Sequence, residues 1–147
     1  MPHYAHTAMR TYHFTLTAPG DFTATVALSG TASLYDLAAL LIKAVGFDFD
    51  HAFEFCDNLK NPYRSKVRYT LFADIGEGQA GDLNVKKSRV QDVFKPRQRL
   101  CFHFDYGDDW MFLVRCDSVE DAAAPRKIKK FLTRTGPPPE QYSECVE

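Results

Sequence analysis

The chain lacks the features that would place it in a membrane or outside the cell. No stretch approaches the roughly 20 consecutive apolar residues of a transmembrane helix, and residues 1–10 contain no apolar run like that of a signal peptide. The four cysteines, at positions 56, 101, 116 and 145, include no Cys-x-x-Cys pair and no spacing typical of a disulfide framework. These absences predict a cytoplasmic protein with reduced thiols and no membrane partner.

The sequence also lacks a large net charge, although its charges are unevenly distributed. Eighteen basic residues nearly balance nineteen acidic ones, so the whole molecule has no strong attraction for a charged partner. Residues 60–99, however, hold ten Lys/Arg against four Asp/Glu, and residues 126–134 contain five basic residues and no acid. The two segments predict a basic face, provided that they meet in space. The residues proposed to contact a partner there are Lys60, Arg64, Lys66, Arg68, Arg126, Lys127, Lys129 and Lys130.

Sequence motifs of the common enzyme classes are absent as well. There is no Gly-x-Ser-x-Gly nucleophile elbow, no His-Glu-x-x-His zinc motif and no phosphate-binding loop ending in Lys-Ser or Lys-Thr. Any catalytic set therefore has to come from residues that are scattered along the chain. The absence favours a binding function over catalysis and leaves enzymatic activity open.

What is present is the pattern of a β-rich domain with one well-marked helix. A length of 147 residues suits one domain, and an aromatic content of 14% favours a sheet-rich core. Residues 12–16 and 22–28 alternate between apolar and polar side chains on either side of an Ala-Pro-Gly-Asp turn, which predicts a β-hairpin. Residues 34–45 carry apolar side chains at helical spacing, between an N-cap at Ser33 and a C-terminal glycine at position 46.

The remaining segments add strands and a second, shorter helix. Four segments alternate as strands, namely 53–55, 66–73, 99–106 and 110–118. Residues 126–132 predict an edge strand, because lysines discourage further strand pairing, and residues 74–87 predict a glycine-containing loop. Residues 88–95 predict a short helix with Ser88 as its N-cap and Gln91 at the capping-box position.

These segments together predict an α+β fold. We expect a mainly antiparallel, twisted sheet with one long helix (34–45) and one short helix (88–95) packed on it. The single domain is expected to span residues 11–136. A loose N-terminus at residues 1–10 and an extended, proline-rich tail at residues 137–147 flank it.

The most informative stretch is Phe102–Phe112, in which two alternating aromatic segments are joined by Gly-Asp-Asp. The aromatic side chains of both segments join one core face only if the positions of paired residues sum to an even number. A three-residue loop satisfies this condition by pairing Tyr106 with Trp110 and Phe104 with Phe112. Such a loop needs a left-handed residue, which aspartate tolerates better than most residues, so we predict this register.

The same stretch, with the segment near residue 50, carries the most reactive side chains of the chain. A histidine beside a carboxylate can act as an acid–base pair, and the candidates for catalysis are Asp105, Asp108, Asp109, His51 and His103. Clustered carboxylates can instead bind Mg²⁺ or Mn²⁺, and the candidate metal ligands are Asp48, Asp50, Asp108 and Asp109. In a third interpretation, Asp108 and Asp109 only hydrogen-bond their own turn.

Several segments resemble the plasmid pRiA4b ORF-3-like family. Gly46-Phe-Asp-Phe-Asp-His-Ala-Phe-Glu-Phe55 is similar to a block in the first half of that family, and Phe104-Asp-Tyr-Gly-Asp-Asp-Trp110 is similar to its Tyr-Asp-Phe-Gly-Asp-Asp-Trp segment. Pro137-Pro-Pro-Glu-Gln-Tyr142 resembles its proline-rich ending. The resemblance covers most of residues 11–142 and implies an α+β domain carried by mobile elements.

Three functional hypotheses follow. The first is a non-enzymatic binding module, without a cofactor, that contacts a nucleic acid or a protein partner through the basic face. The second is a hydrolase or nuclease that depends on a divalent metal held by the Asp and His residues. The third is a structural or protein-interaction domain. The second hypothesis requires the turn at residues 47–51 to lie beside the Gly-Asp-Asp loop.

Overall fold

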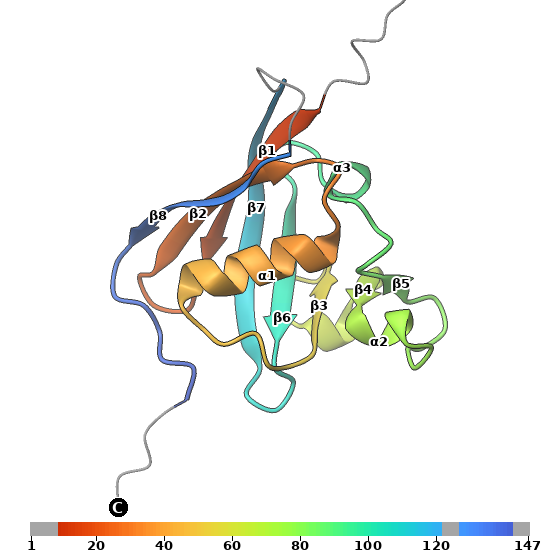
Figure 1. Ribbon diagram of the computed structural model, residues 1–147. Helices are drawn as coiled ribbons and strands as arrows, with labels where there is room; N and C mark the ends of the chain where they lie inside the picture. Colours follow the sequence, from red (N-terminus) through yellow and green to blue (C-terminus); the bar gives the residue numbers. More distant parts are fainter. Residues whose placement is uncertain (1–8, 122–126, 143–147) are drawn as a thin grey trace, which may run out of the picture.

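The computed structural model describes residues 9–121 and 127–142 of the chain. They form an eight-stranded sheet of order β5-β4-β3-β6-β7-β1-β2-β8, whose described pairs are antiparallel except β4 with β5 (Figure 1). The strands are β1 (Arg10–Thr17), β2 (Thr23–Ser29), β3 (Phe53–Cys56), β4 (Arg68–Thr70), β5 (Leu83–Asn84), β6 (Arg99–Phe104), β7 (Trp110–Asp121) and β8 (Lys129–Thr135). The helices are α1 (Leu34–Val45), η2 (Pro62–Arg64), α2 (Leu71–Asp74) and α3 (Val90–Val93). The predicted α+β class is confirmed.

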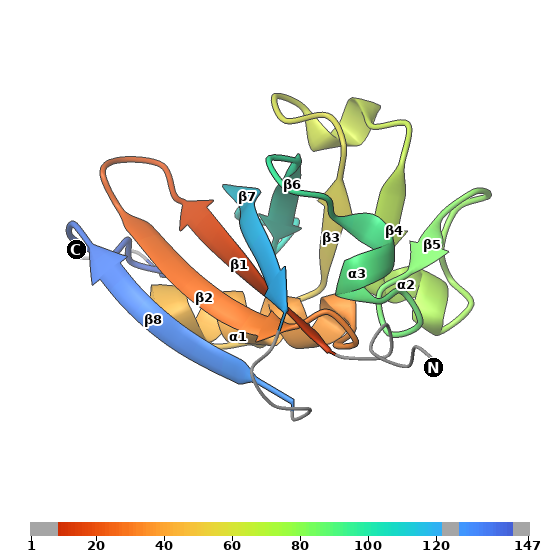
Figure 2. The same cartoon turned by 90° about the horizontal axis from the view of Figure 1, so that it is seen from above.

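Helix α1 lies across one face of the sheet, as the two views in Figures 1 and 2 show. Ser33 caps it, because its side-chain oxygen accepts a hydrogen bond from the Asp36 N–H at 3.0 Å. Gly46 ends it in the left-handed conformation, with φ of 92°. The apolar side of the helix is buried against the sheet, and both predicted ends of the helix are confirmed.

The core between α1 and the sheet is largely aromatic. Eight phenylalanine side chains are essentially inaccessible to solvent, namely Phe14, Phe22, Phe53, Phe55, Phe94, Phe102, Phe104 and Phe112. They come from the predicted opening hairpin, from the central strands β3, β6 and β7, and, in the case of Phe94, from the end of α3. The β1–β2 hairpin has the predicted strands, with Phe14 opposite Val26. The predicted edge strand exists as β8, shifted three residues toward the C-terminus.

The predicted strand at residues 66–73 is wrong in its second half. It pairs only over Arg68–Thr70, and the chain then turns into α2. The cause is Thr70, whose hydroxyl oxygen accepts a hydrogen bond from the Ala73 N–H at 3.0 Å and so caps a helix at that point. The predicted loop at residues 74–87 contains the short strand β5, which pairs with β4 in parallel.

The short helix expected at residues 88–95 exists, but its predicted cap is wrong. Helix α3 covers only Val90–Val93, and its N-cap residue, Arg89, makes no side-chain capping bond. The first helical N–H groups donate instead to backbone carbonyls of the β2–α1 connection: Val90 to Ala32 at 2.8 Å and Gln91 to Gly30 at 2.9 Å. A hydroxyl at position 88 is therefore not needed to satisfy them.

Parts of the predicted termini lie outside the described residues. These parts are residues 1–8 of the predicted loose N-terminus, residues 143–147 of the predicted tail, and Arg126 of the predicted basic face. Arg10, which was expected to be loose, begins β1. Within the described residues, no helix is long and apolar enough to cross a membrane.

Candidate functional site

The hairpin between β6 and β7 has a longer loop than predicted. Phe104 pairs with Trp110 and Phe102 with Phe112, so the predicted pairing of Tyr106 with Trp110 is wrong by two positions. The even-sum condition still holds, which is why Phe102, Phe104 and Phe112 share the core face as expected. Residues 105–109 form the connection, which we call the hairpin loop.

Two aspartates give the hairpin loop its shape. Asp105 and Asp109 both have left-handed backbones, with φ of 66° and 52°. The Asp105 carboxylate accepts hydrogen bonds from the N–H groups of Gly107 at 3.1 Å and Asp108 at 3.3 Å, and its carbonyl accepts one from Asp109. The chain therefore leaves the ladder directly after Phe104. Asp105 and Asp109 then contact two different histidines, one in each of two side-chain clusters.

The first cluster surrounds His103, whose ring is fully buried on the opposite side of β6 from the aromatic core. Its Nδ1 atom lies 2.8 Å from Glu54 Oε2, and its Nε2 atom lies 2.6 Å from Asp109 Oδ1. Carboxylate oxygens accept hydrogen bonds, so both ring nitrogens donate when both carboxylates are ionised. The geometry therefore favours the positively charged imidazolium.

Two further side chains complete this cluster, which we call the buried network. Arg68 Nη2 lies 2.8 Å from the other oxygen of Glu54, whose side chain is only 1% exposed. The Tyr63 hydroxyl donates to the same Asp109 oxygen that contacts His103. The network joins β3, β4, β6, η2 and the hairpin loop. Its members are Glu54, Tyr63, Arg68, His103 and Asp109.

The pKa values follow from these contacts. Burial by itself lowers the pKa of His103, but the hydrogen bonds to Glu54 and Asp109 outweigh it and raise this pKa above its usual value. The hydrogen bond from Tyr63, followed by that from His103, lowers the pKa of Asp109. The same bond to Asp109 raises the pKa of Tyr63 to about 12. Both shifts favour the ion pair between a protonated His103 and an ionised Asp109.

We expect the protein to lose stability as the pH rises through the folded-state pKa of His103. Since this pKa is raised, the contribution of His103 is complete below its unfolded value of about 6.5 and disappears at higher pH. Urea unfolding between about pH 5.5 and pH 9 measures the effect. The variant His103→Gln should show a flatter decline over this interval. A variant curve with the slope of the wild type would contradict the assignment.

The second cluster forms where the turn at residues 47–51, which we call the acidic turn, meets the hairpin loop. His51 Nε2 lies 3.3 Å from Asp105 Oδ2 and 2.8 Å from the Tyr142 hydroxyl. The two acidic segments of the sequence are thus neighbours in space. The aromatic side chains of the acidic turn hold it there, because Phe47 packs against Trp110 with ring centroids 4.9 Å apart.

The proline-rich end of the chain binds to this cluster. Gln141 Oε1 accepts a hydrogen bond from the Asp48 N–H at 2.7 Å, and Gln141 Nε2 donates to Asp50 at 3.0 Å. The Tyr142 hydroxyl donates to Asp50 at 2.8 Å, which lowers the pKa of Asp50 and raises that of Tyr142 to about 12. The segment expected as a tail is therefore attached to the acidic turn through its last described residues.

A cavity of about 460 Å³ lies between this segment and the hairpin loop, and we call it the acidic pocket. Two carboxylates, an indole, a phenol and an amide line it, from Asp108, Glu140, Trp110, Tyr142 and Gln141. The Trp110 ring is itself held in place by stacking on Phe112, at 6.0 Å between centroids. The pocket is therefore formed by two segments about 30 positions apart in the sequence.

Comparison with known proteins identifies the family. The sequence profile described as plasmid pRiA4b ORF-3-like protein matches residues 23–144. The chain belongs to this family. The acidic turn, the hairpin loop and the residues of the acidic pocket all lie within the matched range. No curated protein sequence matches the chain.

The fold of this pRiA4b ORF-3-like protein also occurs in a solved structure. The crystal structure of a protein of unknown function from Methanosarcina mazei Go1 matches with a TM-score of 0.69. The match covers 86% of this chain and 70% of the other, at 18% sequence identity. At this identity the likeness shows a shared fold.

The predicted basic residues lie in two separate places in this pRiA4b ORF-3-like protein. Lys60, Arg64 and Lys66 are exposed in the connection between β3 and β4, whereas Lys127, Lys129 and Lys130 lie at or just before β8. Six strand spacings of about 4.8 Å separate β4 from β8, or roughly 29 Å along the sheet. Arg68 is not free on a surface, because it pairs with Glu54. One continuous basic face is therefore not formed by these groups.

The candidate catalytic and metal-binding residues are divided between the two clusters. Asp109 and His103 belong to the buried network, whereas Asp50, His51 and Asp105 meet at the acidic turn. Within residues 9–121 and 127–142, no group of three or more His, Cys, Asp or Glu is arranged to hold a metal ion. Sequence reasoning missed Glu54, Tyr63, Glu140, Gln141 and Tyr142. For the last three, the available signal was their place in the family's proline-rich ending.

Proposed function

We propose that this protein is a binding module whose acidic pocket receives a basic side chain, Lys or Arg, of a partner protein. The observation that supports this function best is the lining of the pocket. The acidic residues Asp108 and Glu140 line the pocket together with the aromatic residues Trp110 and Tyr142. A cation gains from both kinds of group, because carboxylates attract its charge and an aromatic face attracts it through the ring quadrupole.

The surroundings of the pocket add to its preference for cations. None of the described residues that line it is Lys or Arg. The Asp48 backbone and the Asp50 carboxylate are hydrogen-bonded to Gln141 and Tyr142, which line the pocket. The negative charges of these two aspartates add to the field around the pocket and attract an approaching basic group.

Binding fits the candidate residues better than catalysis does. Both nitrogens of His103 already face carboxylates, so the ring has no free nitrogen with which to take or give a proton. His51 is in contact with Asp105 and with Tyr142. The histidines therefore hold the hairpin loop and the C-terminal segment in position, and Asp108 and Glu140 are left to face the pocket.

The single tryptophan of the chain gives a direct test. Trp110 is the only tryptophan and lines the pocket, so its fluorescence reports on binding there. A Lys/Arg peptide such as acetyl-Arg-Lys-Arg-Lys-amide should change this fluorescence in a saturable way. The charge reversal Asp108→Lys should lower the affinity for the peptide by about tenfold or more, which corresponds to a loss of about 1.4 kcal/mol of binding free energy.

The matched control is Asp121→Lys, at the end of β7 that is far from the pocket. Among the described residues, Asp121 makes only a surface ion pair with Arg10 at 3.6 Å, and it lies eleven positions along β7 from Trp110, or roughly 36 Å. Its charge reversal should leave the affinity nearly unchanged. If both variants weakened peptide binding equally, the effect would come from net charge and the proposed pocket would be refuted. A peptide that leaves Trp110 fluorescence unchanged would refute it as well.

A further inference from the structure

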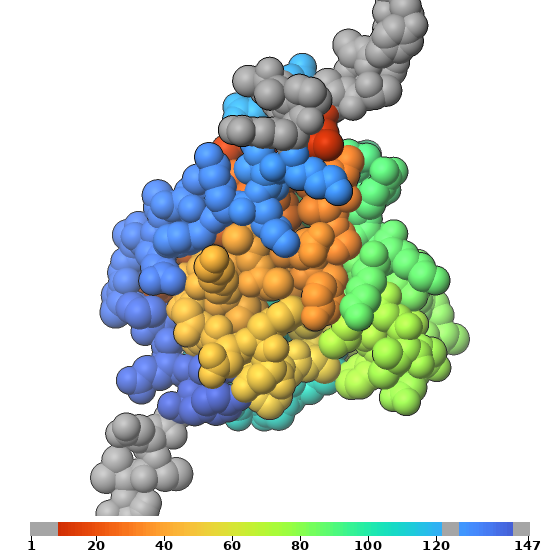
Figure 3. All heavy atoms as spheres, viewed as in Figure 1, coloured from red at the N-terminus to blue at the C-terminus, as the bar shows by residue number. Residues whose placement is uncertain are grey.

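Strand β8 is a long sheet edge with an exposed outer side. It is the last strand of the sheet and pairs with β2 alone among the described strands, and all seven of its residues are exposed. The other edge, β5, is only two residues long. Figure 3 shows the blue atoms of β8 at the surface beside the orange and yellow atoms of α1. An edge of this length offers unpaired backbone groups to an added strand.

The ladder shows which backbone groups face outward. The Ser29 N–H donates to the Ile128 carbonyl at 2.8 Å, so residue 128 uses its backbone groups toward β2. Because hydrogen-bonded and non-hydrogen-bonded pairs alternate in an antiparallel ladder, Lys130 also bonds inward and opposes Ala27. The register shifts only after this stretch, between Val26 and Thr25, and within it the N–H and C=O groups of Lys129 and Phe131 point away from the sheet, to the side where a new strand would pair.

The side chains along this edge are basic and partly apolar. Lys127, Lys129 and Lys130 carry the charge, and Phe131 is 37% exposed. The Arg134 guanidinium is hydrogen-bonded to the carbonyls of Ala44 and Lys43 at the end of α1, and it lies over the Phe131 ring at 4.8 Å from the centroid. The edge therefore offers three lysines followed by an apolar position.

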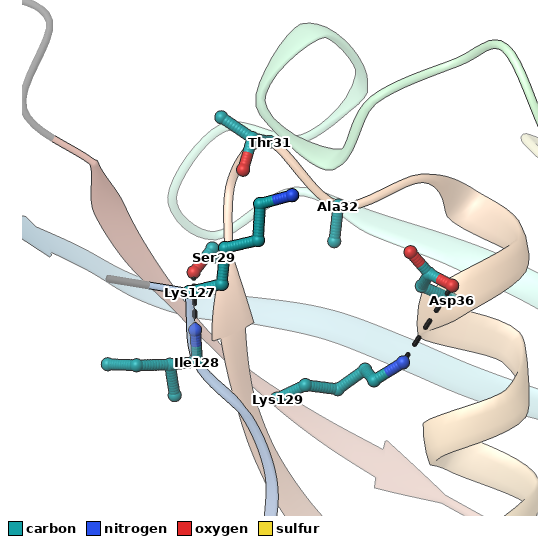
Figure 4. Close-up of a pocket in the computed structure, with 7 residues that line it drawn as sticks. All are labelled: Ser29, Thr31, Ala32, Asp36, Lys127, Ile128 and Lys129. Atoms are coloured by element: carbon teal, nitrogen blue, oxygen red, sulfur yellow. Dashed lines mark hydrogen bonds and ion pairs between the residues drawn. The ribbon is translucent and has the colours of Figure 1, made fainter. Parts of the chain in front are cut away.

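A cavity lies beside the start of this edge (Figure 4). It has a volume of about 140 Å³ and lies between the first turn of α1, the end of β2 and the start of β8. The Lys127 and Lys129 side chains extend along it, and the Thr31 hydroxyl faces it (Figure 4). Asp36 is the one carboxylate among the described residues that line it, and its Oδ1 atom is 3.9 Å from Lys129 Nζ. Two lysines against one carboxylate leave a net positive cavity of a size that suits one acidic side chain.

We propose that the β8 edge binds an extended acidic segment of a partner protein as a ninth strand, with one of its carboxylates in the cavity beside Lys127 and Lys129. Backbone pairing supplies the contact along Lys129–Phe131, and the lysines select an acidic sequence. A second copy of this chain does not fit the same edge, because β8 paired with β8 would bring lysines against lysines. This inference concerns a different surface from the acidic pocket and does not rest on the function proposed above.

Proline substitution separates strand pairing from simple charge attraction. The probe is a fluorescein-labelled peptide of four Glu-Val repeats, and its binding is measured by fluorescence anisotropy. Phe131→Pro removes an outward-facing N–H, which is a change that an edge strand tolerates. It should lower the affinity for the peptide by about tenfold or more. Phe131→Ala keeps the N–H and should weaken it by about threefold or less. Circular dichroism melting shows that both variants fold.

Charge and backbone protection give two independent measurements. The double variant Lys129→Glu and Lys130→Glu should abolish binding of the Glu-Val peptide, and a Lys-Val peptide, which would enter the acidic pocket instead, should not displace the Glu-Val peptide from the wild type. Hydrogen exchange at the amides of Lys129 and Phe131 should slow when the Glu-Val peptide is added. Wild-type affinity in Phe131→Pro, or unchanged exchange at both amides, would overturn the proposal.

Two other outcomes would assign the edge to a different partner and also overturn the proposal. In the first, a labelled DNA duplex binds the wild type with strong salt dependence. The lysine double variant binds this duplex more weakly, whereas Phe131→Pro binds it as the wild type does, which would identify the edge as a phosphate-binding surface. In the second, sedimentation shows that the wild type self-associates through β8 and that Phe131→Pro makes it monomeric.

Discussion

Replacement of Glu54 by alanine is expected to lower the free energy of unfolding by about 3–5 kcal/mol. The Glu54 carboxylate touches two positive groups, His103 at 2.8 Å and Arg68 at 2.8 Å, and it is almost completely buried. Its removal leaves the buried imidazole without one of its two partners and Arg68 without its closest one. A single-domain protein has about 5–15 kcal/mol of stability, so the loss is a large share of the total.

Glu120→Ala is the matched control for this prediction. Glu120 also pairs with a histidine, His13, at 2.9 Å, but its side chain is 65% exposed and the pair lies at the surface. Its loss should cost about 1 kcal/mol or less. Urea unfolding of both variants at pH 6, where His103 is charged, measures the difference. Similar losses from the two variants would show that the buried network contributes no more than a surface ion pair.

Phe104→Ala is expected to lower the free energy of unfolding by a similar amount, about 3–5 kcal/mol. Phe104 is fully buried in β6 and contacts the core on one side through Phe102, at 6.2 Å between ring centroids. On the other side it contacts the acidic turn, through Phe47 at 6.4 Å and Phe49 at 6.3 Å. The substitution therefore leaves a large cavity at the place where the core supports the acidic turn.

This variant should lose function as well as stability. Without the Phe104 ring, the acidic turn loses a packing partner of both Phe47 and Phe49, and with it part of the support for Gln141 and Tyr142. We expect weaker binding of the Lys/Arg peptide to the folded fraction of Phe104→Ala, measured at low temperature by Trp110 fluorescence. Phe72→Ala is the control, because Phe72 is 36% exposed and should cost about 1 kcal/mol or less. Unchanged peptide affinity in Phe104→Ala would show that the pocket does not depend on this packing.

Elements with local causes could be predicted from the sequence. Helix α1 was predicted with both ends, because Ser33 and Gly46 satisfy or terminate backbone groups within a few residues of themselves. The placement of Phe102, Phe104 and Phe112 on one face was also predicted, since side chains alternate along any strand. Where a local cause was overlooked, as with the Thr70 cap that begins α2, the prediction was wrong.

The register of the signature hairpin shows where local reasoning ends. The even-sum condition allowed loops of three or five residues, and the shorter one was predicted. The structure has the longer one because Asp105 leaves the ladder to bond its own loop and to meet His51, which is 54 positions away. That contact depends on how the acidic turn packs over β6, and the alternation of side chains in the hairpin carries no information about it.

The sequence alone therefore determined the α+β class, the long helix and the aromatic face of the sheet. It also indicated the family to which the chain belongs. Only the tertiary structure decided that His103 is held between Glu54 and Asp109, that residues 140–142 complete a pocket at Trp110, and that the basic segments lie far apart. The physical reason is range. Periodicity and capping act over a few residues, whereas these contacts join strands and loops that are distant in the chain and are brought together by burial of the aromatic core.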